Sequence, residues 1–196
     1  MYTAGFAIYI WLGVGMHLRR YASPSNLAAA LRRYRTGVIA IDGVLGVGKS
    51  TLSRRLAKRL GCSVVHLDKH LRKRRGTFFT ALRIGQISRA MTQGSSISII
   101  EGVCALQVLE KLNVSPTAIV YVKRMKNGIW RDEEATIPTT SLSQHLEKLR
   151  NERNEIAQSL QETPASGPSL TEEVVTYHAN YFPQLKATHE YLRTDA

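Results

Sequence analysis

The sequence predicts an α/β fold in which a mostly parallel sheet of about five strands carries helices on both faces. Three observations lead to this prediction. Short runs rich in Val and Ile recur without polar alternation, as is typical of strands that are covered on both sides. Segments with helical periodicity separate these runs. A glycine-rich loop follows the first run, at the point where a strand should turn into a helix.

The composition is that of one globular domain with a strongly basic surface. The chain has 196 residues, of which 43% are apolar and 21% charged, enough to bury a core. Its formal charge of +12 implies a positive field that concentrates anions such as nucleotides, phosphorylated metabolites, nucleic acid and acidic lipid. Cys62 and Cys104 form no Cys-x-x-Cys pair, so we expect neither a zinc site nor a disulfide framework. This cysteine usage favours a reducing, cytoplasmic location.

Residues 1–36 are expected to form a helical extension in front of the main domain. Residues 4–18 are mostly apolar and precede two arginines, so membrane association through this segment is the alternative to a cytoplasmic location. The segment is shorter than the ~20 residues that a spanning helix needs, which favours a helix docked on the domain. A second helix is predicted from Asn26 to Tyr34, with Ser25 or Asn26 as its cap.

The first apolar run, Val38 to Ile41, leads directly into a complete G-x-x-x-x-G-K-[ST] motif. A triphosphate needs several inward-pointing backbone N–H groups at once, and glycines let a loop take that shape without a side-chain clash. The motif therefore predicts a P-loop NTPase fold, a three-layer sandwich that binds ATP. The residues expected to bind the nucleotide are Gly43, Val44, Gly46, Val47, Gly48, Lys49, Ser50 and Thr51.

The polar side chains of this loop have separate expected roles. Lys49 places a positive charge on the β- and γ-phosphates, and we expect it to serve catalysis without contributing to packing. The Ser50 hydroxyl is a candidate ligand for Mg²⁺, and Thr51 lies where the α-phosphate meets the helix N-terminus. ATP and Mg²⁺ are thus the expected cofactors.

Two further predicted strands end in carboxylates. The run from Cys62 to Leu67 precedes Asp68, and the run from Ser96 to Ile100 precedes Glu101. Because ligands bind at the carboxyl ends of parallel strands, both acids are expected to face the phosphate loop. Asp68 is the candidate general base, with capping of the next helix as the alternative. Glu101 is the candidate metal-holding acid, with an ordinary surface position as the alternative, and the choice of base between the two acids stays open.

The remaining elements complete the β-α alternation. Leu52, Leu56 and Leu60 share one face of the helix that follows the loop, and Gly61 is its C-terminal stop. The other predicted elements are a helix from Val103 to Leu112, a fourth strand from Ala118 to Val122, a charge-rich helix from Ser141 to Gln161, a loop over residues 163–169 and a helix from Leu170 to Tyr181. No further domain boundary is expected, so residues 37–196 form one P-loop domain.

Four segments within residues 37–132 also carry a family resemblance: Ile-Asp-Gly-Val-Leu-Gly-Val-Gly-Lys-Ser-Thr at 41–51, His-Leu-Asp at 66–68, Ile-Ile-Glu-Gly-Val at 99–103, and Arg131-Asp132. Together they make the chain similar to the uridine kinase-like branch of P-loop kinases, which includes nicotinamide riboside kinases, pantothenate kinases and phosphoribulokinases. In that family the acid after the second strand is the base or an acceptor ligand, and basic residues after the fourth strand belong to a lid over ATP. The resemblance therefore implies catalytic roles for Asp68 and Arg131 beside Lys49.

The chain departs from the family pattern on the acceptor side. The family usually places a second acid or an aromatic residue after the strand-two acid, whereas residues 69–71 are Lys-His-Leu. Arg72 to Arg75 add four cations there, which would suit a substrate that already bears phosphate or carboxylate; a solvated loop is the alternative. The same two alternatives, neutralisation of phosphate charge or a solvated helix face, apply to Lys123, Arg124 and Lys126.

The expected function is an ATP-dependent phosphotransferase that moves the γ-phosphate of ATP to a hydroxyl of a nucleoside-like or related small molecule. One alternative is a P-loop kinase or ATPase associated with nucleic acid. Aromatic residues make up only 7% of the chain and are not interleaved with the cations, which disfavours this alternative. Another alternative is a nucleotide-responsive module bound to a membrane or a partner through residues 4–18.

Overall fold

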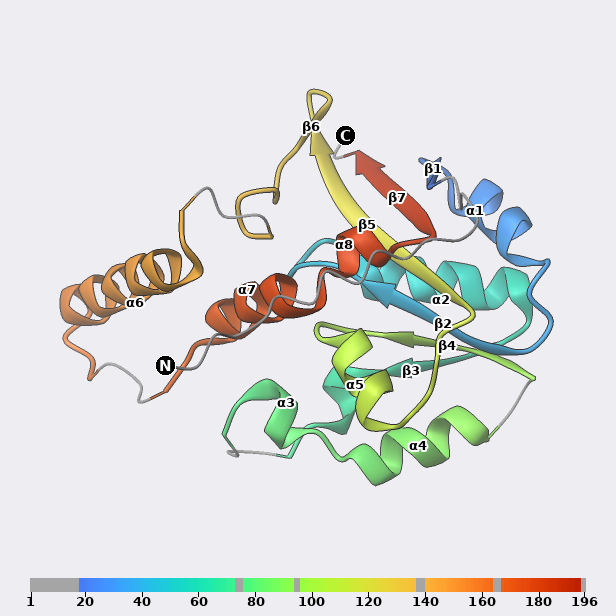
Figure 1. Cartoon of the computed structure of the whole chain (residues 1–196), viewed down its shortest axis with the longest axis horizontal. Coiled ribbons are helices and arrows are strands. Elements are labelled where there is room, and N and C mark those ends of the chain that lie inside the picture. The colour runs from blue at the N-terminus through green and yellow to red at the C-terminus, as the bar shows by residue number, and fades with distance from the viewer. Residues whose placement is uncertain (1–17, 73–75, 94–95, 137–139, 164–166, 195–196) are drawn as a thin grey trace, which may run out of the picture.

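The computed structural model describes residues 18–72, 76–93, 96–136, 140–163 and 167–194 (Figure 1). Almost all of the apolar segment 4–18, and three of the four cations at 72–75, lie outside the described residues. Among the described residues, no helix combines the length and the apolar character needed to cross a bilayer.

The centre of the molecule is a mostly parallel sheet of seven strands, which confirms the predicted fold class with a somewhat higher strand count. The strands lie in the order β1-β7-β5-β2-β4-β3, and only β6 is antiparallel, as a hairpin partner of β5. Their bounds are β1 Arg19–Tyr21, β2 Gly37–Asp42, β3 Ser63–His66, β4 Ile97–Glu101, β5 Ala118–Lys126, β6 Ile129–Trp130 and β7 His189–Thr194. The two shortest strands, β1 and β6, are too short for a hydrophobic pattern to reveal them.

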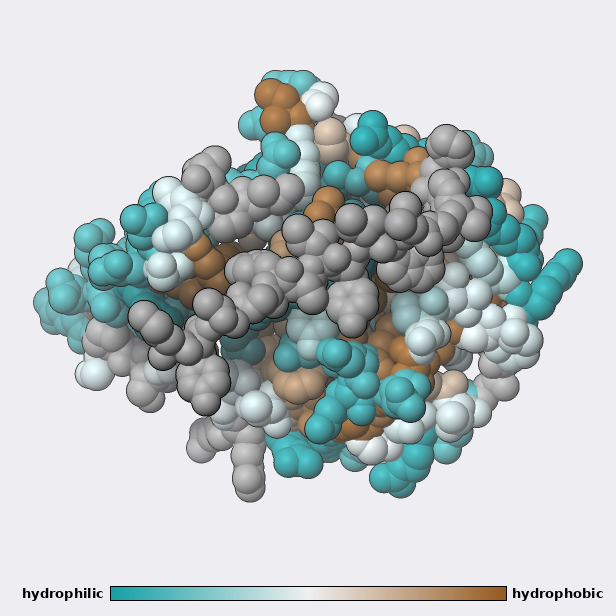
Figure 2. All heavy atoms as spheres, in the orientation of Figure 1, coloured by the Kyte–Doolittle hydropathy of each residue, from teal (hydrophilic) through white to brown (hydrophobic). Residues whose placement is uncertain are grey.

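Helices cover both faces of the sheet, with α2 on one side and α5 and α8 on the other (Figure 1). Their bounds are α1 Pro24–Leu31, α2 Lys49–Leu60, α3 Phe78–Ala81, α4 Ile84–Thr92, α5 Ala105–Lys111, α6 Leu142–Ser159, α7 Leu170–Tyr181 and α8 Pro183–Lys186. A short 3-10 helix, Leu67–His70, follows β3. The charge-rich helix α6 shows mainly hydrophilic side chains on its outer surface (Figure 2).

Local capping decides where several helices begin and end. The helix expected from Asn26 begins at Pro24 instead, because the Ser23 hydroxyl accepts the Ser25 N–H at 3.2 Å and proline fits the first helical turn. The predicted cap at Ser25 or Asn26 was therefore wrong. Helix α2 ends at Gly61 with φ +67°, as the sequence predicted.

The strand ends that carry the site residues are brought together by the register of the sheet. Glu101 pairs with Ile41 on one side and with His66 on the other. Residues in register across parallel strands point to the same face, so the ends of β2, β3 and β4 meet at one edge. Gly102 makes the turn after Glu101 with φ +154°, where a Cβ would lie 2.7 Å from Leu67 Cβ.

The described part of the amino-terminal extension joins this sheet. Strand β1 pairs in parallel with β7, and Leu27 and Leu31 of α1 are fully buried in the same hydrophobic core as the strands. The ring of His189 in β7 stacks on Tyr21 at 5.8 Å between centroids and meets the edge of Tyr34 at 6.2 Å. These contacts fasten the extension to the sheet at its outer edge.

The buried imidazole of His189 makes stability depend on pH. Burial, together with nearby arginines, lowers its pKa to about 4, because the charged form loses its hydration. The unfolded chain therefore binds a proton between pH ~6.5 and ~4 that the folded chain does not, so stability falls as pH decreases through this window, by up to ~1.4 kcal/mol per pH unit. His189→Phe keeps an aromatic ring between Tyr21 and Tyr34. Urea unfolding of this variant at pH 4.5, 5.5 and 7 should give a free energy of unfolding that depends less steeply on pH than that of the wild type. Equal slopes for the two proteins would rule out His189 as the titrating group.

Candidate active site

The phosphate loop lies between β2 and α2, as its motif predicts. Gly43 has φ +143°, and a Cβ there would lie 2.8 Å from the carbonyl oxygen of Val122, so only glycine fits the start of the loop. Gly48 takes a left-handed conformation with φ +100° immediately before α2. Ser50 is half-buried and Thr51 is exposed in the first turn of this helix. The N-terminus of α2 thus presents its free N–H groups at the loop, where an anion is stabilised.

The side chain of Lys49 is buried inside the loop. Its Nζ donates hydrogen bonds to the carbonyl oxygens of Gly43 at 2.8 Å and Val44 at 2.6 Å. Burial lowers the pKa of Lys49, whereas the negative charges of Asp42, Glu101 and Asp68 act to raise it. The expectation that Lys49 does not contribute to packing was wrong, because the ammonium group ties the two ends of the loop together.

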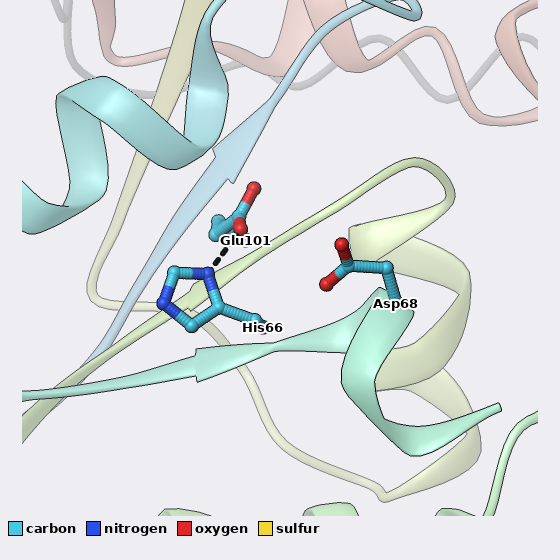
Figure 3. Close-up of side chains that lie close together, drawn as sticks. All are labelled: His66, Asp68 and Glu101. Atoms are coloured by element: carbon cyan, nitrogen blue, oxygen red, sulfur yellow. Dashed lines mark hydrogen bonds and ion pairs between the residues drawn. The ribbon is translucent and has the colours of Figure 1, made fainter.

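Asp68 and Glu101 lie close together, beside His66, a residue to which the sequence analysis assigned no role. The ligand atoms of His66, Asp68 and Glu101 all lie within 4.8 Å of one another (Figure 3). His66 Nδ1 forms a short hydrogen bond with Glu101 Oε1. Glu101 is buried and Asp68 is exposed, so the first carboxylate is held in place and the second faces solvent. The arrangement offers carboxylate oxygens for a metal ion and a free basic oxygen beside them.

A third carboxylate, Asp42, sits directly beneath the phosphate loop and was missed by the sequence reasoning. It is fully buried, accepts the Gly43 N–H at 2.7 Å on Oδ1, and accepts a short hydrogen bond from the Tyr177 hydroxyl on Oδ2. Burial raises the pKa of Asp42, and these hydrogen bonds with the charge of Lys49 act against that rise. The same Tyr177 hydroxyl accepts the Leu106 N–H at 3.2 Å, so it links α7 and α5 to the start of the loop.

The basic residues after the fourth strand lie on β5 and in the segment after β6 rather than on a helix. Lys123 Nζ pairs with Glu190 at 2.5 Å and lies over the ring of Trp130 at 4.3 Å, so it links β5 to β7 and β6. Arg124 pairs with the buried Asp132 at 2.5 Å. This pair holds the segment that follows β6 against β5.

Arg131 and Lys126 are exposed in the same region. The N–H of Arg131 donates to the carbonyl oxygen of Arg124 at 2.9 Å, at the base of the hairpin. Its side chain lines a surface cavity with Glu134 of the same segment and His145 of α6. Arg131 is therefore placed beside α6, on the segment that the resemblance identifies as a lid.

A cavity of about 250 Å³ lies between α3, α5 and α7, next to the carboxyl ends of the strands. Its polar lining consists of the side chains of Thr77, Gln107, Glu173, Thr176, Tyr177, Asn180 and Tyr181. Cys104 lines it as well, three residues after Glu101, and burial with the charge of Asp42 raises the pKa of Cys104 to about 12, which makes the thiol unreactive. Both oxygens of Glu173 accept the N–H of Phe78, at 3.0 and 2.8 Å, and so join α7 to the start of α3.

The chain is similar in sequence to a curated shikimate kinase from Bacillus cytotoxicus, with 27% identity over 99 residues, which cover 50% of this chain and 56% of that protein. It thus spans about half the length of this relative. No protein-family model matches the chain.

Among solved structures, the chain is similar to a possible uridine kinase from Bacillus stearothermophilus, with 14% identity, a TM-score of 0.48, and coverage of 86% of this chain and 96% of that one. It is also similar to a protein assigned provisionally as a fructose transport system kinase from Silicibacter sp. TM1040, with 15% identity, a TM-score of 0.41, and coverage of 86% and 98%. A uridine kinase-like protein is thus among the chains that resemble this one. What the site can do follows from its own residues.

The bond between Tyr177 and Asp42 should be among the more important polar contacts for stability. Tyr177→Phe leaves the ring in place but removes the donor of a buried carboxylate and the acceptor of the Leu106 N–H, so it should cost ~2–3 kcal/mol of unfolding free energy. Urea unfolding at pH 7 measures this loss. Tyr181→Phe is the matched control, because the Tyr181 hydroxyl donates to the exposed Glu110 and its loss should cost under ~1 kcal/mol. Similar losses in the two variants would contradict the role given to Asp42.

Proposed function

We propose that the protein is an ATP-dependent phosphotransferase that moves the γ-phosphate of ATP to a hydroxyl group of a small molecule. The observation that carries the proposal is the group of Asp68 and Glu101, whose ligand atoms lie within 4.8 Å of each other and whose charges both act on Lys49 of the phosphate loop. A loop that binds phosphates needs no exposed acid beside it, whereas transfer to a hydroxyl needs an acceptor for the departing proton.

Each of these residues has a separate role in the proposed reaction. The loop N–H groups and Lys49 hold the β- and γ-phosphates. Asp68 accepts the proton of the acceptor hydroxyl as its oxygen bonds to the γ-phosphorus, and the bond to the bridging oxygen of ADP breaks on the opposite side. Arg131, on the segment after β6, is the proposed cation that balances the charge developing at the phosphates.

The donor set fits Mg²⁺. This ion prefers oxygen ligands and keeps several of its waters, so one or two protein oxygens are sufficient. Ser50 and Glu101 are the proposed ligands, and His66 holds the Glu101 carboxylate in a fixed orientation through its Nδ1 hydrogen bond. When bound, the ion supplies charge neutralisation at the phosphates.

The cavity between α3, α5 and α7 is the proposed acceptor site. Hydroxyl and amide side chains dominate its polar lining, and among the described lining residues Glu173 alone carries a charge. A polyhydroxylated neutral molecule can exchange hydrogen bonds with such a wall, whereas a carboxylate or phosphate on the acceptor would face the negative charge of Glu173 with no cation among the described lining residues. The described lining therefore favours a neutral nucleoside or sugar, whereas Lys73, Arg74 and Arg75, which suggested an anionic acceptor, lie outside the described residues.

An acceptor screen tests both the function and the acceptor class. With Mg-ATP, we expect ADP release to rise at least ~10-fold more with a neutral acceptor, such as uridine or fructose, than with the anionic shikimate. The reason is that the carboxylate of Glu173 repels the carboxylate of shikimate. A coupled assay for ADP over a panel of nucleosides, sugars and shikimate makes the measurement. Absence of ATP binding by calorimetry would reject the proposed function, and stimulation by shikimate alone would reject the proposed acceptor class.

Asp68→Asn should separate rate from affinity. The variant keeps the size of the side chain but loses the basic oxygen, so phosphate transfer to an accepted substrate should fall by ~10²–10⁴-fold. The dissociation constant for ATP, measured by calorimetry, should stay within ~2-fold, since Asp68 is exposed and lies on the 3-10 helix after β3 rather than on the loop.

Glu101→Gln is the control for the assignment of the base. It removes the charge of the proposed metal ligand, so it should raise the Mg²⁺ concentration needed for half-maximal rate, whereas Asp68→Asn should leave that concentration nearly unchanged. A wild-type transfer rate in Asp68→Asn, with Glu101→Gln inactive at saturating Mg²⁺, would assign the base to Glu101 instead.

A further inference from the structure

A second cavity borders the phosphate loop, and neither Asp68 nor Glu101 is among its described lining residues. Its volume is about 330 Å³, and its lining includes Gly48 and Thr51 of the motif, Arg193 and Thr194 at the end of β7, and Ala22 and Pro24 of the amino-terminal extension. It shares no described lining residue with the cavity between α3, α5 and α7. Of these two cavities, only the second has described lining residues in the phosphate-binding motif.

The position of this cavity matches the nucleoside end of a bound nucleotide. Lys49 and the two acids mark the end of the loop where the γ-phosphate is proposed to lie. Thr51, in the first turn of α2, is at the position expected for the α-phosphate, from which the ribose continues. A ribose attached there would leave the loop on the side where Gly48 and Thr51 border the cavity.

The chemistry of the lining suits a sugar and a base. Thr51 and Thr194 offer hydroxyl groups for the ribose, and Arg55, Tyr191 and Arg193 offer flat groups on which a base can stack. Arg193 lies against the loop. Its Nη1 donates to the carbonyl oxygen of Gly46 at 3.4 Å, and a Cβ on Gly48 would lie 3.0 Å from this Nη1. The end of β7 and the phosphate loop thus form one continuous surface.

We propose that the amino-terminal extension is part of the nucleotide site, with Ala22 and Pro24 forming the outer wall of the pocket for the base and ribose. The inference rests on the proposed binding of ATP. It gives a function to a segment that precedes the phosphate-binding motif, and it assigns the nucleoside to the cavity between α2, β7 and the extension.

Two sets of contacts hold this wall in place. Strand β1 pairs with β7 in the register Tyr21↔Tyr191, and Arg20 pairs with Glu190 at 3.0 Å. On the other side, Arg59 Nε of α2 donates to the Ser25 hydroxyl at 3.3 Å. Strand β7 and helix α2 form the other two walls of the cavity, so the extension connects these two walls. Nucleotide affinity should therefore depend on the docking of residues 19–24.

The test compares ATP with inorganic tripolyphosphate, which has the phosphates but no nucleoside. Calorimetry with Mg²⁺ is carried out on the full chain, on Ala22→Trp and on Ala29→Trp. Ala22 is exposed at the rim of the cavity, and a tryptophan there occupies the space for the base. Ala29 is an exposed alanine of α1 that does not line the cavity, so the second variant is the matched control. Hydrogen exchange of residues 19–23 is followed with each ligand.

We expect Ala22→Trp to weaken ATP binding by ~10-fold or more and to change tripolyphosphate binding by less than ~2-fold, with Ala29→Trp equal to the wild type for both. ATP, but not tripolyphosphate, should slow amide exchange at residues 19–23. The proposal is overturned if Ala22→Trp weakens the binding of ATP and of tripolyphosphate equally. It is also overturned if Ala22→Trp binds ATP as tightly as Ala29→Trp does and ATP gives these amides no added protection. Failure of the wild type to bind either ligand would instead reject the proposed function.

Discussion

The structure of the site depends on how a buried lysine is compensated. An ammonium group removed from water loses a large hydration free energy unless hydrogen bonds and opposite charges replace it. Lys49 donates two hydrogen bonds to carbonyl oxygens of its own loop, and the negative charges of Asp42, Glu101 and Asp68 partly offset its positive charge. In the proposed reaction the same ammonium group exchanges these partners for the phosphate oxygens of the nucleotide.

Asp42 connects this electrostatic balance to the rest of the domain. Its carboxylate lies at the end of the central strand β2, and the hydroxyl that donates to it comes from α7, 135 residues further along the chain. In the same helix, His178 Nε2 and the Tyr121 hydroxyl of β5 form a hydrogen bond of 2.9 Å, and burial lowers the pKa of this imidazole. Helix α7 is therefore fixed to two central strands by polar contacts, and Glu173 of this helix in turn positions α3 beside the proposed acceptor site.

Much of the fold could be predicted because its signals are local. Val38 to Ile41 is apolar because β2 is buried on both faces, and Gly61 stops α2 because its backbone is left-handed there. The strand-end acids Asp68 and Glu101 were found by the same reasoning, since parallel strands end at one edge. Asp42 carried an equal signal, a carboxylate that ends an apolar strand, and applying that rule to the strand before the motif would have found it.

Other parts of the site depend on contacts that no local pattern encodes. Tyr177 has a helical position typical of core packing, and only the approach of α7 to β2 gives its hydroxyl a buried partner. Strand β1 has the sequence Arg-Arg-Tyr, with no apolar alternation, and it forms because the edge of β7 offers unpaired backbone groups. Lys123 and Arg124 resemble a phosphate-binding cluster in sequence, yet their ion pairs to Glu190 and Asp132 assign them to the sheet and its hairpin.

Glu190 shows how the edge of the sheet and the nucleotide site are joined. Its buried carboxylate pairs with Arg20 of β1 at one oxygen and with Lys123 of β5 at the other, so one acid holds three neighbouring strands together. The Arg20 side chain is 67% exposed, so water screens its attraction to Glu190 and the pair adds little to the free energy of folding. The backbone pairing of β1 with β7 sets the register, and the ion pair is compatible with it. Since β7 ends in Arg193, which contacts the phosphate loop, the same register determines where the extension meets the cavity beside Thr51.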